Sequence, residues 1–165
     1  MAENKIRDVF VVGLRNAHAM EHQALSIMKP QLSRMESYPD IVAKLEQHIQ
    51  ETRGQIIRLE SILDELDEDH SKLKDVALSL TGMVSAMGHT MAEDEVLKNS
   101  FANFAFENFE IAAYRSLLTI AEAGSFRAAT TALQSNLAEE QAMAQWLDEN
   151  LAAVTRKFLL LREVG

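Results

Sequence analysis

The sequence predicts an all-α protein, a four-helix bundle built from two antiparallel helical hairpins that duplicate each other. The chain of 165 residues contains only two prolines and six glycines, whereas Ala, Leu, Glu and Gln, which favour helices, abound. Four long segments place apolar residues three and four positions apart, the period of an amphipathic helix. Two pairs of glutamates repeat with equal spacing. The length suits one domain, which we expect to span residues 1–165.

The first hairpin is predicted to consist of helices over residues 4–35 and 40–66. Pro30 lies inside the first helical pattern and removes one backbone donor, so we expect a kink there. Pro39 suits the first turn of the second helix. In that helix the apolar steps alternate between four and three residues throughout. Three polar residues occupy the middle of its apolar stripe, namely His48, Thr52 and Gln55.

The second hairpin is predicted over residues 92–123 and 126–160, with Gly124 and Ser125 in the turn. Between the two hairpins, residues 70–91 are predicted to form a long, partly helical connection. Antiparallel neighbours need only about 2–8 residues between them. We therefore expect a crossover that returns the chain to the starting end of the bundle.

Each predicted helix carries glutamate in or beside its apolar stripe. Glu21 and Glu51 are 30 residues apart, as are Glu110 and Glu140, and the midpoint of each pair falls at a predicted turn. Residues equidistant from the turn of an antiparallel hairpin lie at the same height, here about 22 Å from it at 1.5 Å per residue. Packing the hairpins about a pseudo-two-fold axis would bring the four carboxylates together.

Such a set of buried carboxylates favours a metal site. A glutamate buried alone costs several kcal/mol unless it is protonated, paired or metal-bound. Two-metal sites in helical bundles use inward glutamates, usually with Glu-x-x-His. This chain has the reverse order in His48-x-x-Glu51, and Glu107 precedes Glu110 by three, so each pair shares a helix face. We expect one or two ions of iron, or of another divalent metal such as manganese or zinc.

The alternative is a metal-free network in which the glutamates share protons or bond to His48, Gln55 and Tyr114. We expect Gln55 to be a hydrogen-bond partner of the site and Tyr114 to be buried and hydrogen-bonded. His18 is expected to be a hydrogen-bonded helix residue, and His22 is expected to point outward.

The composition disfavours several other functions. The chain has no cysteine, which excludes disulfides, thiolate nucleophiles and iron–sulfur clusters. A net charge of −9 disfavours binding to nucleic acid. The start of the chain lacks the pattern of a signal peptide, and the uncharged stretch 76–92 is too short and polar to span a membrane, so we expect a cytoplasmic protein. No Rossmann fingerprint or phosphate-binding glycine loop is present, and whether the chain is an enzyme stays open.

Four segments resemble one bacterial family: HAMEHQAL, QHIQETRGQIIRLE, FENFEIAAYRSLL and LAEEQAMAQWL, in that order. They are similar to the YciE/YciF stress-induced proteins over about residues 5–160, most closely to YciE. The resemblance implies a ferritin-like bundle of the rubrerythrin type, a link to stress response without an assigned reaction, and a homodimer. Exposed apolar residues such as Val11, Val12 and 159–161 also favour a dimer. The metal-site residues that the resemblance implies are Glu21, Glu51, Glu110 and Glu140, with His48 and Glu107 as further matches.

The chain departs from the family pattern at three places. Some members have His where this chain has Asn108, and some have Asp where it has Ala144. A glutamate cluster of the YciF branch is replaced around residues 80–82. Each change removes a metal ligand or a group that would orient one. Three interpretations therefore remain: a di-metal protein, a metal-free structural or interaction protein, and an iron-storage subunit.

Overall fold

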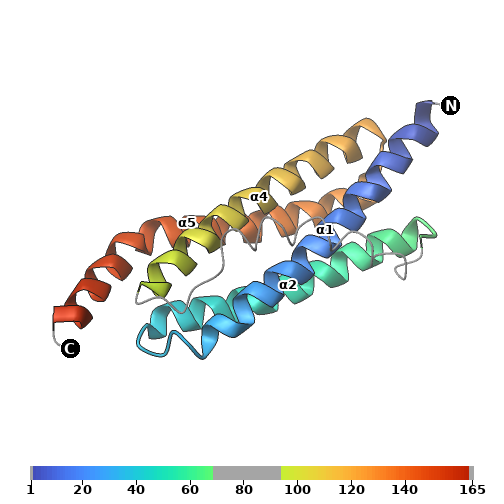
Figure 1. Ribbon diagram of the computed structural model, residues 1–165. Helices are drawn as coiled ribbons and strands as arrows, with labels where there is room; N and C mark the ends of the chain where they lie inside the picture. Colours follow the sequence, from blue (N-terminus) through green and yellow to red (C-terminus); the bar gives the residue numbers. More distant parts are fainter. Residues whose placement is uncertain (1, 69–93, 164–165) are drawn as a thin grey trace.

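The computed structural model describes residues 2–68 and 94–163, and within these ranges the chain forms four long helices. They are α1 (Ala2–Leu32), α2 (Pro39–Glu65), α4 (Glu95–Ala123) and α5 (Arg127–Glu163). Helix α1 packs against α2 and α4, and α5 packs against α4 and α2, so the four helices close around one core (Figure 1). The all-α four-helix bundle is confirmed.

The connection between the hairpins was predicted over residues 70–91, which lie outside the described residues. Its two ends are informative. Helix α2 ends and helix α4 begins at opposite ends of the bundle (Figure 1). Because the helices of each hairpin are antiparallel, α2 ends where α1 begins, and the two hairpins start from opposite ends of the bundle (Figure 1). The prediction that the chain returns to the starting end before the second hairpin was therefore wrong.

The turns follow the predicted signals with small shifts. Pro39 is the first residue of α2, and Asp40 places an acidic side chain in its first turn, where the helix dipole favours negative charge. Pro30 lies in the last turn of α1, which ends at Leu32. This proline therefore precedes the end of the helix by two residues, so the predicted kink would fall in the last turn of α1.

The turn between α4 and α5 depends on a close approach at Gly124. A Cβ atom there would lie 2.2 Å from the Phe126 ring and 2.9 Å from the Ile6 side chain. The Phe126 ring also stacks on Phe10 of α1, with ring centroids 4.5 Å apart. Glycine is required at this position because the ring that ties the turn to α1 occupies the space beside it.

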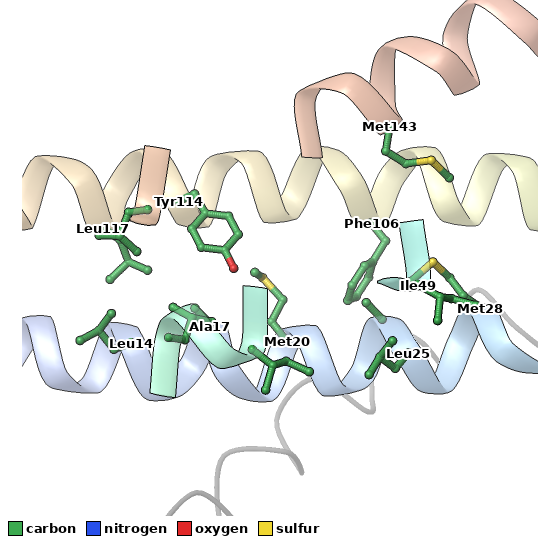
Figure 2. Close-up of a cluster of buried hydrophobic side chains, with 14 of the residues drawn as sticks. Leu14, Ala17, Met20, Leu25, Met28, Ile49, Phe106, Tyr114, Leu117 and Met143 are labelled. Atoms are coloured by element: carbon green, nitrogen blue, oxygen red, sulfur yellow. The ribbon is translucent and has the colours of Figure 1, made fainter. Parts of the chain in front are cut away.

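The core lies along the predicted stripes of α1 and α2. Leu14, Leu45 and Leu59 are at most 1% exposed, which removes their side chains from water at about 25 cal/mol per Å² of apolar surface. Figure 2 shows how the buried side chains of α1 face those of α4. The labelled residues of these two helices are Leu14, Ala17, Met20, Leu25, Met28, Phe106, Tyr114 and Leu117.

Two expectations about the surface were wrong. The spacing of three and four residues from Glu107 and Ser100 predicts that Phe104 faces the core, but Phe104 is 36% exposed, while Phe106 is buried. Phenylalanines occur on several sides of α4, so its apolar period does not select one face. Val11 was expected to be exposed but is buried against the core, whereas Val12 is exposed as predicted. Within the described ranges, no helix is long and apolar enough to span a bilayer.

Candidate metal centre

A group of buried polar residues crosses the middle of the bundle and draws on all four helices. We call it the carboxylate cluster; it consists of Glu21, His48, Glu107, Glu110 and Glu140. All five are at most 3% exposed. One ligand atom from each of the last four residues lies within 4.8 Å of the others. Burial raises the pKa of Glu21, and the charge of nearby Glu140 raises it further.

Apolar periodicity explains why these polar side chains point inward. Glu21 is four residues from both Ala17 and Leu25, which are buried in α1. Glu110 stands in the same relation to Phe106 and Tyr114 in α4. Residues four apart share one face of a helix, so burial of the apolar neighbours forces the glutamates into the centre of the bundle.

His48 contacts carboxylates on both sides of its imidazole ring. Its Nε2 atom lies 3.2 Å from Glu107 Oε2 and 3.4 Å from Glu140 Oε2. Its Nδ1 atom lies 3.0 Å from Glu51 Oε2, on the other side of the ring. The Glu51 side chain is 24% exposed and also accepts a hydrogen bond from Gln47 Nε2 at 2.7 Å. Glu51 therefore meets the cluster only through the imidazole.

Two neutral side chains each donate a hydrogen bond to one carboxylate oxygen, and a third neutral side chain supports one of these donors. Gln55 Nε2 donates a hydrogen bond to Glu140 Oε1. The Tyr114 hydroxyl donates to Glu21 Oε1 and accepts a hydrogen bond from Asn136 Nδ2 at 2.9 Å. The expected roles of Gln55 and Tyr114 are thus present in the structure.

Six buried atoms of the cluster make no hydrogen bond within the described part of the chain, although His48 Nε2 faces two carboxylates at ion-pair distance. The six atoms are Glu21 Oε2, His48 Nε2, Glu107 Oε2, both Oε atoms of Glu110, and Glu140 Oε2. A buried polar atom left without a partner costs about 1–3 kcal/mol, and more when it is charged. Five carboxylate oxygens and one imidazole nitrogen directed at one another form a donor set that suits a divalent cation.

Burial and the charges of neighbouring groups shift the pKa values within the cluster, some upward and some downward. Burial raises the pKa of Glu21 and of Glu110 well above 4.5, and the charge of Glu140 raises both further. Burial also raises the pKa of Glu107 to about 8, although His48 opposes it. Burial would lower the pKa of His48, but its carboxylate neighbours raise it to about 12. For Glu140, burial is outweighed by contacts with His48 and Glu107, so its pKa is lowered. Without a metal, several glutamates therefore hold protons at neutral pH beside a His48–Glu140 ion pair.

The structure brings five of the six predicted site residues together and leaves Glu51 at the edge. His18 contacts Glu60 of α2, with Nε2 and Oε1 3.0 Å apart, and His22 is exposed, as expected.

Sequence reasoning missed Asn136. This residue lies four positions before Glu140 and three after the buried Leu133, so its place in the stripe of α5 was readable.

Replacing Tyr114 with phenylalanine should destabilise the protein by about 1–3 kcal/mol, because it leaves Glu21 Oε1 without its donor and removes the nearer of the two acceptors of Asn136 Nδ2. Urea unfolding in the presence of chelator measures this loss. The control is Tyr38→Phe, which removes the same hydroxyl from a half-buried tyrosine at the α1–α2 turn. Equal effects in the two variants would contradict a role for the buried hydroxyl.

Comparison with known proteins agrees with the four-helix fold. A family model described as a domain of unknown function, DUF892, matches residues 5–160. Protein YciF of Escherichia coli is 29% identical over 145 residues, which cover 83% of this chain and 84% of YciF. A crystal structure of a Xanthomonas campestris protein superposes with a TM-score of 0.80 at 30% identity, covering 96% of this chain and 99% of the other. The crystal structure of the E. coli stress protein YciF gives a TM-score of 0.72 at 24% identity, covering 92% and 98%. The chain therefore belongs to the DUF892 family, the YciE/YciF-type proteins that its four motifs resemble.

Proposed function

We propose that the carboxylate cluster binds a divalent metal, iron or manganese before zinc, as a two-metal site in a ferritin-like stress-response protein. The observation that carries this is Glu110, whose two carboxylate oxygens are fully buried and have no hydrogen-bond partner among the residues that the structure describes. A bound cation would satisfy both oxygens at once. The preponderance of carboxylate over imidazole favours iron and manganese over metals that prefer nitrogen.

The contacts of His48 support its assignment as the nitrogen ligand. Its Nδ1 faces Glu51 at 3.0 Å, and its Nε2 faces the carboxylates of α4 and α5. Metal-bound histidines in proteins commonly donate their second N–H to a carboxylate, which fixes the ring and its tautomer. Glu51 takes this orienting role, and Glu21, Glu107, Glu110 and Glu140 supply the oxygen ligands.

The protein residues also set the conditions for chemistry at this site. The metal, when bound, supplies Lewis-acid or redox reactivity. Gln55 and Tyr114 hold one oxygen each of Glu140 and Glu21 and so orient the remaining oxygens toward the centre. The apolar residues around the cluster exclude bulk water, which strengthens every charge interaction inside it.

The name of YciF as a stress protein supports a stress role for this chain. We also propose that the protein acts in the cytoplasm as a homodimer. Exposed apolar side chains support a dimer, among them Val12 at 54% and Leu160 at 61% exposure. Multi-angle light scattering measures the mass directly. A monomer would contradict the dimer, and a large closed shell would favour iron storage instead.

A metal-free structural protein is the second candidate, and one observation favours it. The raised pKa values of Glu21 and Glu110 mean that both carboxyls can stay neutral in the folded chain. Protonated carboxyls tolerate burial far better than carboxylates do. In that case the cluster is a buried polar network without a metal.

Metal content of two neighbouring variants separates these candidates. The parent protein, loaded with Fe²⁺ or Mn²⁺ and then desalted, should retain about two ions per chain. Glu140→Gln should lose at least one of them, because an amide is a poor replacement for a carboxylate ligand. Glu139→Gln is the matched control, since the Glu139 side chain is partly exposed and pairs with Arg58. Failure of the parent to retain either metal would leave the metal-free network as the better conclusion.

A further inference from the structure

A second group of metal-ligating side chains lies at the seam between α1 and α2, away from the carboxylate cluster. It consists of His18 and His22 of α1 and Glu60 of α2. One ligand atom from each lies within 4.8 Å of the others. The two imidazole rings are in edge contact, with centroids 4.6 Å apart and planes at 61°. His18 Nε2 and Glu60 Oε1 are 3.0 Å apart.

Helix geometry explains why the three side chains meet. His18 and His22 are four residues apart, so they lie one turn apart on the same face of α1. Helix α2 packs antiparallel against α1 and presents Glu60 beside them. No loop positions any of these residues. The spacing of the ligands is therefore set by two rigid helices rather than by flexible segments.

The exposure of the three side chains is graded from the core outward. The His18 side chain is 8% exposed and that of Glu60 is 38% exposed, while His22 is exposed. The group is thus closed on the side of the bundle and open to solvent on the other. Zinc-type sites that use three protein ligands have this form, because water completes the tetrahedron.

We propose that His18, His22 and Glu60 bind one divalent ion of the zinc class, with solvent as the fourth ligand. Two imidazoles and one carboxylate suit zinc, cobalt, nickel and copper, whereas the carboxylate cluster suits iron and manganese. The two sites share no ligand, so each can fail without the other. By joining α1 to α2, the ion stabilises the first hairpin.

The residues from His18 to His22 also spell His-x-x-Glu-His, the order found in one class of zinc peptidases. In those enzymes the glutamate stands beside the metal as a general base. Here Glu21 is fully buried and accepts a hydrogen bond from Tyr114 inside the bundle. The glutamate therefore faces away from the histidine pair, and the site binds metal without a peptidase base.

Zinc titration of the full chain tests the proposal. Calorimetry should show that the parent binds one more equivalent of Zn²⁺ than His22→Ala or Glu60→Gln does. Taking the difference matters because the carboxylate cluster also accepts zinc. His22 is exposed, so its truncation leaves the core intact. Glu46→Gln, at an exposed position on the same helix as Glu60, is the matched control and should bind as the parent does.

A second readout assigns the extra equivalent to these side chains. In NMR spectra of the imidazole groups, the first Zn²⁺ equivalents should shift the signals of His18 and His22 in Glu140→Gln, whose carboxylate cluster is impaired. Zinc should also raise the melting temperature of Glu140→Gln but not that of Glu140→Gln/His22→Ala. Equal zinc stoichiometry in the parent and His22→Ala, or unshifted His18 and His22 signals, would overturn the proposal. Neither result would bear on iron or manganese in the carboxylate cluster.

Discussion

The metal-free protein should lose stability as the pH rises from about 5 to about 8, and the metal-loaded protein should gain stability over the same range. The loss of stability in the metal-free protein follows from Glu21, Glu107 and Glu110, whose pKa values are all raised in the folded state. A group with a raised pKa stabilises the fold fully below its unfolded pKa, near 4.5. That stabilisation is lost as the pH rises through the folded pKa.

Three other groups define the window. The raised pKa of His48 acts in the same direction, but only above about 6.5, where the unfolded imidazole begins to lose its proton. The pKa values of Glu51 and Glu140 are lowered. Their stabilisation is present above about 4.5 and is lost only as the pH falls below that value. The metal-free protein should therefore be most stable near pH 5. Each proton that only the folded state holds gives a slope of about 1.4 kcal/mol per pH unit.

Metal reverses the slope because its ligands must be deprotonated. Binding then releases protons, so the affinity and the stabilisation by metal both rise with pH. Thermal melting from pH 5 to 8, with chelator or with excess Mn²⁺, measures both slopes. Overall negative charge also destabilises a protein at high pH, so Glu110→Met, which lacks one titrating carboxyl, is the control and should show a shallower slope with chelator. A metal-free parent that is more stable at pH 8 than at pH 5 would show that its buried glutamates are ionised.

The fold was readable from the sequence because the periodicity of α1 and α2 is unambiguous. Every predicted stripe position of α2 from Ile41 to Ile62 is buried. The stripe of α4 was harder to define because apolar side chains surround much of that helix, and packing against α1 and α5 selects the buried face. Burial of Phe106 rather than Phe104 is a tertiary effect that a single-helix pattern does not contain.

The equal spacing of the glutamate pairs predicts the height of each side chain in the bundle but not the direction in which it points. A separation of 30 residues across a hairpin fixes the height of two side chains but not their rotation about the helix axis. Glu51 follows His48 by three residues, so the two side chains point about 60° apart around the helix axis, and His48 takes the inward position. The glutamate at the right height therefore ends beside the cluster, in contact with the histidine ring.

The surface group of His18, His22 and Glu60 shows a second limit. The spacing of the two histidines within α1 is visible in the sequence, but their partner lies on α2, 42 residues after His18. Many glutamates in α2 could face α1, and only the packing of the two helices selects Glu60. The partners of Arg58 were unpredictable for the same reason. It donates hydrogen bonds to Asn136 and Glu139, which lie on another helix, α5.

Glu110→Met should make the metal-free protein more stable and should abolish its stabilisation by metal. The Glu110 side chain is fully buried, and neither of its oxygens has a hydrogen-bond partner within the described ranges. Burial raises its pKa, and repulsion from Glu140 and Glu21 raises it further. Methionine has a similar length, carries no charge and fills irregular core space well. By analogy with buried ionic groups replaced by apolar residues, we expect a gain of about 1–4 kcal/mol.

The same substitution removes a carboxylate that the proposed metal needs. Mn²⁺ should therefore raise the melting temperature of the parent but leave that of Glu110→Met unchanged, because a ligand stabilises only the state that binds it. Glu110→Ala separates removal of charge from loss of volume. It relieves the same repulsion but leaves a cavity, so it should be less stable than Glu110→Met by about 2–5 kcal/mol. Urea unfolding with chelator, repeated with Mn²⁺, measures all three proteins. A metal-free Glu110→Met that is less stable than the parent would mean that the Glu110 carboxyl holds the bundle together by hydrogen bonds, and the metal-free structural protein would then be the better conclusion.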